Sequence, residues 1–136
     1  MKEKNINFEL SQIKTELEII NLLKSILKST ELDKIQIRAA ASSLHSIYNG
    51  IEKILLFKIK DRNIKLATED RRHSELLEIA TTEKIISNNT AKRLKKYLGF
   101  RHFFRHNYGF MLDLELIKPL IEDIENLIIE FEKEIL

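Results

Sequence analysis

Apolar positions three and four residues apart recur along nearly the whole chain, which is the spacing of helices that each bury one face. The sequence contains three glycines and one proline in 136 residues, so it offers few places for tight turns. No internal repeat or low-complexity segment interrupts the pattern. We therefore predict an all-α fold, an antiparallel up-and-down bundle of four to five helices.

Short polar stretches divide this pattern into segments. We expect a first helix that ends around 29–30, a second from about 33 to 60, a connecting loop up to 72, a third from about 73–74, a fourth from about 90 to 106, and a C-terminal helix. Pro119 allows two interpretations of the last helix: it lies in the first turn, or it kinks a helix that begins near Asp113.

The apolar stripes of these segments identify the candidate core. On the first and last helices the expected core positions are Phe8, Ile13, Leu17, Ile20, Leu27, Leu120, Ile124, Leu127, Ile128 and Phe131. On the second and third helices they are Ile37, Leu44, Ile47, Ile51, Leu55, Leu76, Leu77 and Ile79. With 43% hydrophobic residues, the chain can build one real core, so we expect one domain over residues 1–136.

Cysteine is absent, which excludes disulfides and thiolate metal sites and suits a reducing compartment. The N-terminal residues lead directly into an amphipathic stretch that carries charges throughout. Neither a signal peptide nor a membrane span is therefore expected. These features together predict a cytoplasmic protein.

Charge is distributed unevenly, although the formal net charge is only +2. No acidic residue occurs between Lys84 and Leu112, whereas acidic residues predominate from Asp113 onward. The basic residues of the first stretch are Lys84, Lys92, Arg93, Lys95, Lys96, Arg101 and Arg105. The fourth helix should attract a polyanion and the last should repel one. For Lys92, Lys95 and Lys96, a solvated face and an RNA path both remain open.

The segment from Phe100 to Tyr108 concentrates arginine, histidine and tyrosine beside aromatic residues. At about 100° per residue, one arc of the helix carries Arg101, His102, Arg105 and His106, and the opposite side carries Phe100, Phe103 and Phe104. We interpret the phenylalanines as core rather than as platforms for base stacking. The other face is cationic and titratable.

This residue set suits phosphodiester chemistry. Arginine binds phosphate oxygens through two parallel hydrogen bonds, and the ordinary pKa of histidine lies near neutrality. Metal-free RNA cleavage needs a base for the ribose 2′-hydroxyl, a positive charge for the transition state and an acid for the leaving oxygen. His102 and His106 could instead bind a metal, but Arg101 and Arg105 would repel the cation, so we expect no metal and no cofactor. His45 is expected to be structural.

Arg101 and His106 lie five residues apart and point about 140° from one another on an ideal helix. A shared site therefore needs one of three arrangements: an arginine stem that reaches around, a helix that ends near Gly109 and swings His106 inward, or a second copy of the same helix. The third predicts a symmetric dimer with paired sites at its seam.

Arg101, His106 and Tyr108 reproduce an Arg-x4-His-x-Tyr signature, and the chain resembles HEPN-domain proteins of the HepT-like toxin branch. The polar His102 after the arginine conforms to that pattern. Residues 48–55 resemble the second-helix segment of these proteins, and residues 73–77 resemble the start of their third helix. The resemblance extends over essentially the whole chain, and the Arg/His/Tyr cluster is its specific part.

The resemblance implies a HEPN-like bundle that is the toxin of a type II toxin-antitoxin system. The toxin would be a homodimeric, metal-independent endoribonuclease with a minimal nucleotidyltransferase as antitoxin. His106 would act as general base or acid and Arg101 would bind the scissile phosphate, with His102 or Arg105 assisting. The RNA-binding candidates are Arg105, Lys92, Lys95 and Lys96.

In this branch the motif tyrosine accepts AMP from the antitoxin, which implies modification of Tyr108. AMP would add bulk and a negative phosphate beside Arg101 and Arg105, which could pair with it and exclude RNA. Neutralisation by occlusion alone is the alternative. Two other functions also remain: a non-catalytic, substrate-binding partner of a nucleotidyltransferase, and a dimeric adaptor that binds nucleic acid without cutting it.

Overall fold

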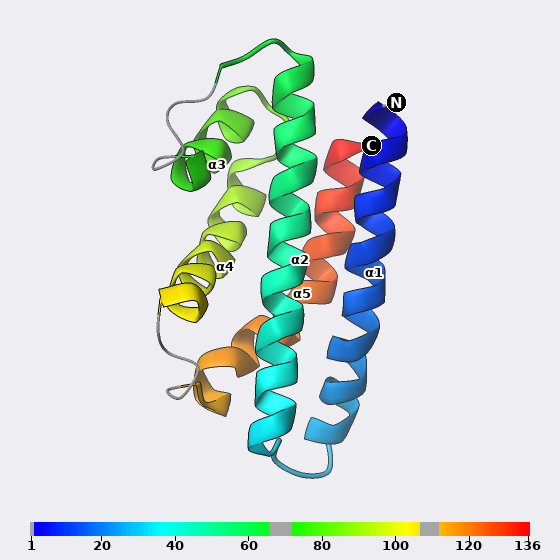
Figure 1. Cartoon of the computed structure of the whole chain (residues 1–136), viewed down its shortest axis with the longest axis vertical. Helices are drawn as coiled ribbons and strands as arrows, with labels where there is room; N and C mark the ends of the chain where they lie inside the picture. The colour runs from blue at the N-terminus through cyan, green and yellow to red at the C-terminus, as the bar shows by residue number, and fades with distance from the viewer. Residues whose placement is uncertain (1, 66–71, 107–111) are drawn as a thin grey trace.

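The computed structural model describes residues 2–65, 72–106 and 112–136, and these ranges form five α-helices and no strand. The helices are α1 (Lys2–Leu27), α2 (Lys34–Asp61), α3 (Arg72–Thr82), α4 (Asn88–His106) and α5 (Leu114–Ile135). Consecutive long helices run in opposite directions, and the two chain ends lie at the same end of the bundle (Figure 1). The all-α bundle expected from the sequence is confirmed.

Helix α2 is the centre of the arrangement, because it packs against all four other helices. Helices α1 and α5 lie on one side of it, and α3 and α4 lie on the other (Figure 1). The residues of α2 with no solvent exposure are Ala40, Ala41, Leu44, Ile47, Ile51, Ile54, Leu55 and Ile59. Among the described residues, no helix combines the length and the apolar character that a membrane span requires.

Side-chain caps fix the starts of α2 and α4. The Asp33 carboxylate accepts the Gln36 backbone N–H at 2.7 Å, and the Gln36 side chain accepts the Asp33 backbone N–H at 2.9 Å, which forms a capping box. The Ser87 hydroxyl accepts the Thr90 backbone N–H at 3.1 Å. Helix α4 therefore begins at Asn88, two residues earlier than the apolar pattern predicted.

A side-chain cap also determines where Pro119 lies within α5. The Asp113 carboxylate accepts the Leu116 backbone N–H at 2.9 Å, so α5 begins at Leu114 and Pro119 lies inside it. Proline cannot donate a backbone N–H to the preceding turn and crowds that turn sterically. The first turns of α5 accordingly run at an angle to the rest of the helix (Figure 1). The second interpretation, a kinked helix that begins near Asp113, is correct.

One contiguous core contains residues from all five helices. Most of the expected core positions are buried in it or packed against it, but the prediction for Phe8 is wrong, because its side chain is 60% exposed. The buried stripe of α1 instead passes through Ile6, Leu10 and Ile13. Phe8 lies on the opposite side of that helical turn.

Two glycines on different helices are expected to respond oppositely to alanine. A Cβ on Gly50 would lie 2.9 Å from Cγ1 of the buried Ile13, whereas a Cβ on Gly99 would meet no atom within 4 Å. Gly50→Ala should therefore lower the free energy of unfolding by about 1–3 kcal/mol through overpacking. In the monomer, Gly99→Ala should raise it by about 0.5–1 kcal/mol through helix propensity.

Urea unfolding of both variants beside the wild type measures this pair of effects. Each variant adds the same methyl group to a helical glycine, so each serves as the control for the other. Equal shifts in the same direction would contradict the close approach of α1 and α2 at Gly50.

Candidate functional site

The C-terminal part of α4 has an apolar and a polar face, as the sequence predicted, except that Arg101 and Phe103 are half-buried between them. Phe100 is buried, Phe104 packs against the core, and their ring centroids lie 5.9 Å apart. His102, Arg105 and His106 are exposed on the other side. The phenylalanines thus fasten the helix to the bundle, and the imidazoles stay accessible to solvent.

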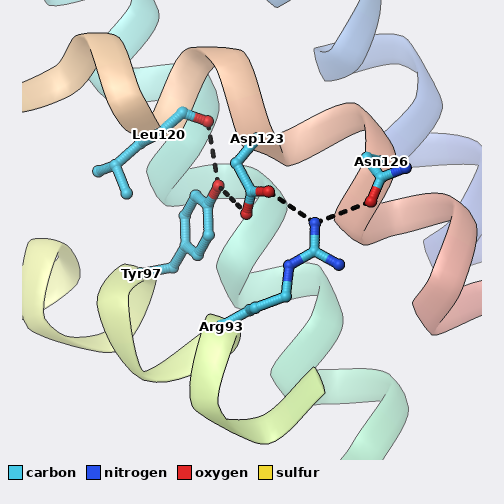
Figure 2. A network of polar contacts seen from close by, with 5 residues as sticks. All are labelled: Arg93, Tyr97, Leu120, Asp123 and Asn126. Carbon is cyan, nitrogen blue, oxygen red and sulfur yellow. Dashed lines mark hydrogen bonds and ion pairs between the residues drawn. The ribbon is translucent and has the colours of Figure 1, made fainter. Parts of the chain in front are cut away.

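A polar network fastens the preceding turns of α4 to α5 (Figure 2). The buried Tyr97 hydroxyl donates to the Leu120 carbonyl at 3.0 Å and to Asp123 at 3.4 Å. The Arg93 guanidinium donates to Asp123 at 2.6 Å and to Asn126 at 3.0 Å. Burial, then the nearby Asp123 carboxylate, raise the pKa of Tyr97 and keep its hydroxyl protonated. Arg93 is therefore bound to α5, unlike the neighbouring lysines.

Arg101 is turned toward α2 rather than toward the exposed histidines. Its Nε donates a 2.9 Å hydrogen bond to Oδ1 of Asn49, and the side chain is half-buried. The Asn49 amide nitrogen lies 3.4 Å from Nδ1 of His45, one helical turn earlier on α2. The His45 ring in turn packs on Phe104, with centroids 4.9 Å apart. Arg101, Asn49, His45 and Phe104 form one connected group between α2 and α4.

His45 is neutral within this group. Burial is the main cause that lowers its pKa, and the positive charges of Arg101 and Arg105 lower it further. Because Asn49 uses its oxygen to accept from Arg101, its amide nitrogen must donate to His45 Nδ1. The His45 proton then resides on Nε2, a buried atom with no hydrogen-bond partner among the described residues. His45, expected to be structural, contacts the motif helix directly.

A buried tyrosine, which has a buried carboxylate beside it, lies within electrostatic reach of Arg101. Tyr48 and Glu52 are 1% and 7% exposed and occupy successive turns of α2. Burial and the Glu52 carboxylate raise the pKa of Tyr48, and the positive charge of Arg101 acts in the opposite direction. The guanidinium is thus close enough to act electrostatically on groups inside the bundle. It is anchored between the interior and the surface.

His102 and His106 form a pair at the end of α4, with ring centroids 4.4 Å apart and an angle of 43° between the planes. Both are exposed, and no contact links Arg101 to His106 in the described part of this chain. The divergence expected from their spacing is therefore present. Nor does any group of three or more His, Asp or Glu side chains with metal-binding geometry occur in the described ranges. Tyr108 and Gly109 lie outside the described residues.

Exposed cations continue from this site along α4. Lys92, Lys95 and Lys96 are exposed and have no ion pair within the described ranges. The acidic surface expected on α5 is partly neutralised, because Asp123 binds Arg93 and Glu132 binds Lys14 at 3.1 Å. Three exposed lysines thus precede the motif on its own helix.

Sequence reasoning missed Asn49 as a site residue and assigned His45 to structure. The sequence did contain a pattern that indicates a polar contact at this place. Positions 45, 49 and 52 carry polar side chains about one turn apart on a helix that is otherwise rich in apolar residues. Polar groups on such a face need partners. The partner, Arg101, is 52 residues away in the chain, and only the packing of α4 on α2 reveals it.

The protein is a helical bundle in which an arginine of α4 is anchored on α2 and a histidine pair lies at the end of α4. The family model described as HepT-like protein matches residues 39–136, and the chain belongs to this family. A solved structure described as YutE, a cytosolic protein of unknown function from Bacillus subtilis, is 17% identical with a TM-score of 0.76. That match covers 98% of this chain and 87% of the YutE chain and reflects the shared fold. A search of curated proteins found no match.

The lowered pKa of His45 predicts a pH dependence of stability. The unfolded chain should bind a proton at His45 near the ordinary value of about 6.5, while the folded chain should do so only at lower pH. Between these two values the unfolded state binds more protons, so stability falls as the pH decreases. His45→Gln should remove the contribution of this side chain, so the free energy of unfolding should vary less with pH. Urea unfolding between pH 5 and pH 8 measures it, with Ser46→Ala on the neighbouring position as the control.

Proposed function

We propose that this HepT-like protein is a metal-independent endoribonuclease and the toxin of a type II toxin-antitoxin system. The observation that carries the proposal is the position of Arg101: it lies on α4, whose end presents two exposed imidazoles, and its Nε is anchored to Asn49 of α2. A fixed cation and titratable groups at one helix end are the components that phosphodiester cleavage needs. Lys92, Lys95 and Lys96 supply the adjoining positive surface for RNA.

In the proposed reaction, His106 takes the proton from a ribose 2′-hydroxyl, and the 2′-oxygen attacks the phosphorus. The bond from phosphorus to the 5′-oxygen breaks, and a protonated group, His102 or a second His106, gives a proton to that oxygen. The products are a 2′,3′-cyclic phosphate and a 5′-hydroxyl end. Arg101 binds the phosphate oxygens, whose negative charge grows in the transition state. Arg105 adds positive charge beside it.

Arg101 and His106 diverge within one chain, and this supports a homodimer in which each site uses both copies of α4. Gly99 favours such an approach. It is exposed on α4 between the lysines and the motif, and a Cβ there would face open space. An exposed glycine inside a helix lowers helix stability without any benefit to the monomer, so its place on this face suits a closely approaching backbone.

The proposed partner is a minimal nucleotidyltransferase antitoxin that transfers AMP to Tyr108. Tyr108 follows the last residue of α4 by two positions, so an attached phosphate would lie within a short distance of Arg105 and His106 along the chain. The added negative charge would compete with RNA for the arginines. The alternative functions, a non-catalytic partner module and a nucleic-acid adaptor, do not need the Arg/His pair.

Removal of either group should abolish the reaction. We expect Arg101→Ala and His106→Ala each to lower the rate of RNA cleavage at least a hundredfold, on the order of the contribution of one acid–base or electrostatic group. Cleavage of labelled RNA in the presence of chelator measures the effect, and helical circular dichroism checks the fold. Arg62→Ala is the matched control, since that arginine binds the Glu83 carbonyl outside the site. Full activity in both variants would overturn the proposal.

Tyr108→Phe tests the modification. The variant lacks the hydroxyl that accepts AMP but keeps the ring, so we expect it to cleave RNA and inhibit growth even when the antitoxin and ATP are present. Mass spectrometry of toxin treated with antitoxin and ATP measures the adduct. Wild-type toxin should gain mass and the variant should not. An AMP adduct on another residue of the variant would refute the assignment to Tyr108.

The same purified proteins separate the three functions. Cleavage of labelled RNA in chelator identifies the ribonuclease, and binding without cleavage identifies the adaptor. If the protein neither binds nor cuts RNA but binds the nucleotidyltransferase, it is the partner module.

A further inference from the structure

The guanidinium of Arg101 is held at one edge only. Arginine has N–H groups on Nε and on both terminal nitrogens, and they point in fixed directions in one plane. Nε donates to Asn49 at 2.9 Å, and the terminal nitrogens have no partner among the described residues. One edge is therefore committed to α2, and no group of the described residues occupies the edge formed by Nη1 and Nη2, which can bind a second planar or tetrahedral acceptor.

The Asn49 amide can form hydrogen bonds with both Arg101 and His45 in one orientation only. Its oxygen must face Arg101, because an arginine only donates, and its nitrogen must therefore face His45. Nδ1 of His45 is an acceptor only while it carries no proton. The ring is fixed by its packing on Phe104, which belongs to the same helix as Arg101. His45 thus selects one of the two orientations of the Asn49 amide.

We propose that Asn49, oriented by neutral His45, is the positioning residue of Arg101 and directs the Nη1/Nη2 edge of its guanidinium at the scissile phosphate. The inference rests on the proposed ribonuclease function and deepens it. A free arginine side chain has many rotamers, and holding it in one of them before the substrate arrives lowers the entropic cost of binding in the transition state.

Protonation of His45 is the natural switch of this arrangement. A proton on Nδ1 would remove the acceptor for the Asn49 amide nitrogen. If the Asn49 amide then rotated so that its oxygen faced the imidazolium, its nitrogen would face Arg101, which cannot accept a hydrogen bond. The charged groups that face His45 are Arg101 and Arg105 on α4, and both oppose its protonation. Asn49 on α2 and Phe104 on α4 also contact the His45 ring, and neither side chain carries a charge.

The first test observes the guanidinium directly, without any activity. In ¹⁵N-labelled protein the Nε–H signal of Arg101, assigned by its loss in Arg101→Ala, should exchange slowly with water. Asn49→Ala should make that exchange at least tenfold faster, since the acceptor is gone. Asn126→Ala is the matched control: it removes a similar arginine–asparagine hydrogen bond, the one from Arg93, and should leave the Arg101 signal unchanged.

The second test uses cleavage. Asn49→Ala should lower kcat on labelled RNA by about tenfold to a hundredfold, because misplacement of a catalytic group by about 1 Å costs that much, while Asn126→Ala keeps the wild-type value. At position 45, Gln keeps an acceptor for the Asn49 amide and Leu does not. His45→Gln should therefore retain most of the activity, and His45→Leu should resemble Asn49→Ala.

The outcomes separate the positioning role of Asn49 from the proposed nuclease function. If the protein cleaves RNA and neither Asn49→Ala nor His45→Leu changes kcat or the exchange of the Arg101 signal, positioning by Asn49 is refuted and the nuclease stands. If the protein cleaves no RNA, the exchange experiment and its pH dependence in wild type against His45→Gln still decide whether His45 and Asn49 hold the guanidinium. Equal exchange in wild type and Asn49→Ala would refute the inference in that case as well.

Discussion

The burial of α2 by all four other helices is the constraint on which the structure depends. Because four helices pack on it, the buried positions of this helix must be apolar or bonded to another group. The places where polar side chains interrupt it are therefore informative. His45 and Asn49 interrupt it on the side of α4, where Arg101 donates to Asn49. The polar contact of α2 with the motif is therefore made at this interruption.

The packing of α4 follows from two attachments of different kinds. Phe100 and Phe104 place its last turns against the core, and the Tyr97 and Arg93 contacts with α5 fix the turns before them. A helix fixed at both places cannot rotate about its axis. Arg101, which follows the buried Phe100, is consequently held at the boundary between core and solvent, where its stem can reach Asn49. The orientation of the motif is thus a consequence of apolar packing together with the polar contacts to α5.

Sequence periodicity was sufficient for the helices and for the two faces of α4, because both depend on spacing within one segment. The kink at Pro119 was left open, since it depended on whether Asp113 or a later residue caps α5. Phe8 was misassigned because the first turns of α1 contain several apolar residues, and the packing of this helix buries Ile6 and Leu10 instead. The contact of Arg101 with Asn49 joins segments 52 residues apart, and local patterns carry no information about such a pair.

Similarity of fold and similarity of site answer different questions in this protein. The chain shares its architecture with YutE at 17% identity, which shows that two widely different sequences form this bundle. Function must be argued from the site placed on it. A bundle needs Phe100 and Phe104, but it gains nothing from an exposed imidazole pair, from three lysines without ion pairs or from Gly99 with open space above it. Residues that the fold does not require, gathered along one helix, are the physical basis of the proposed function.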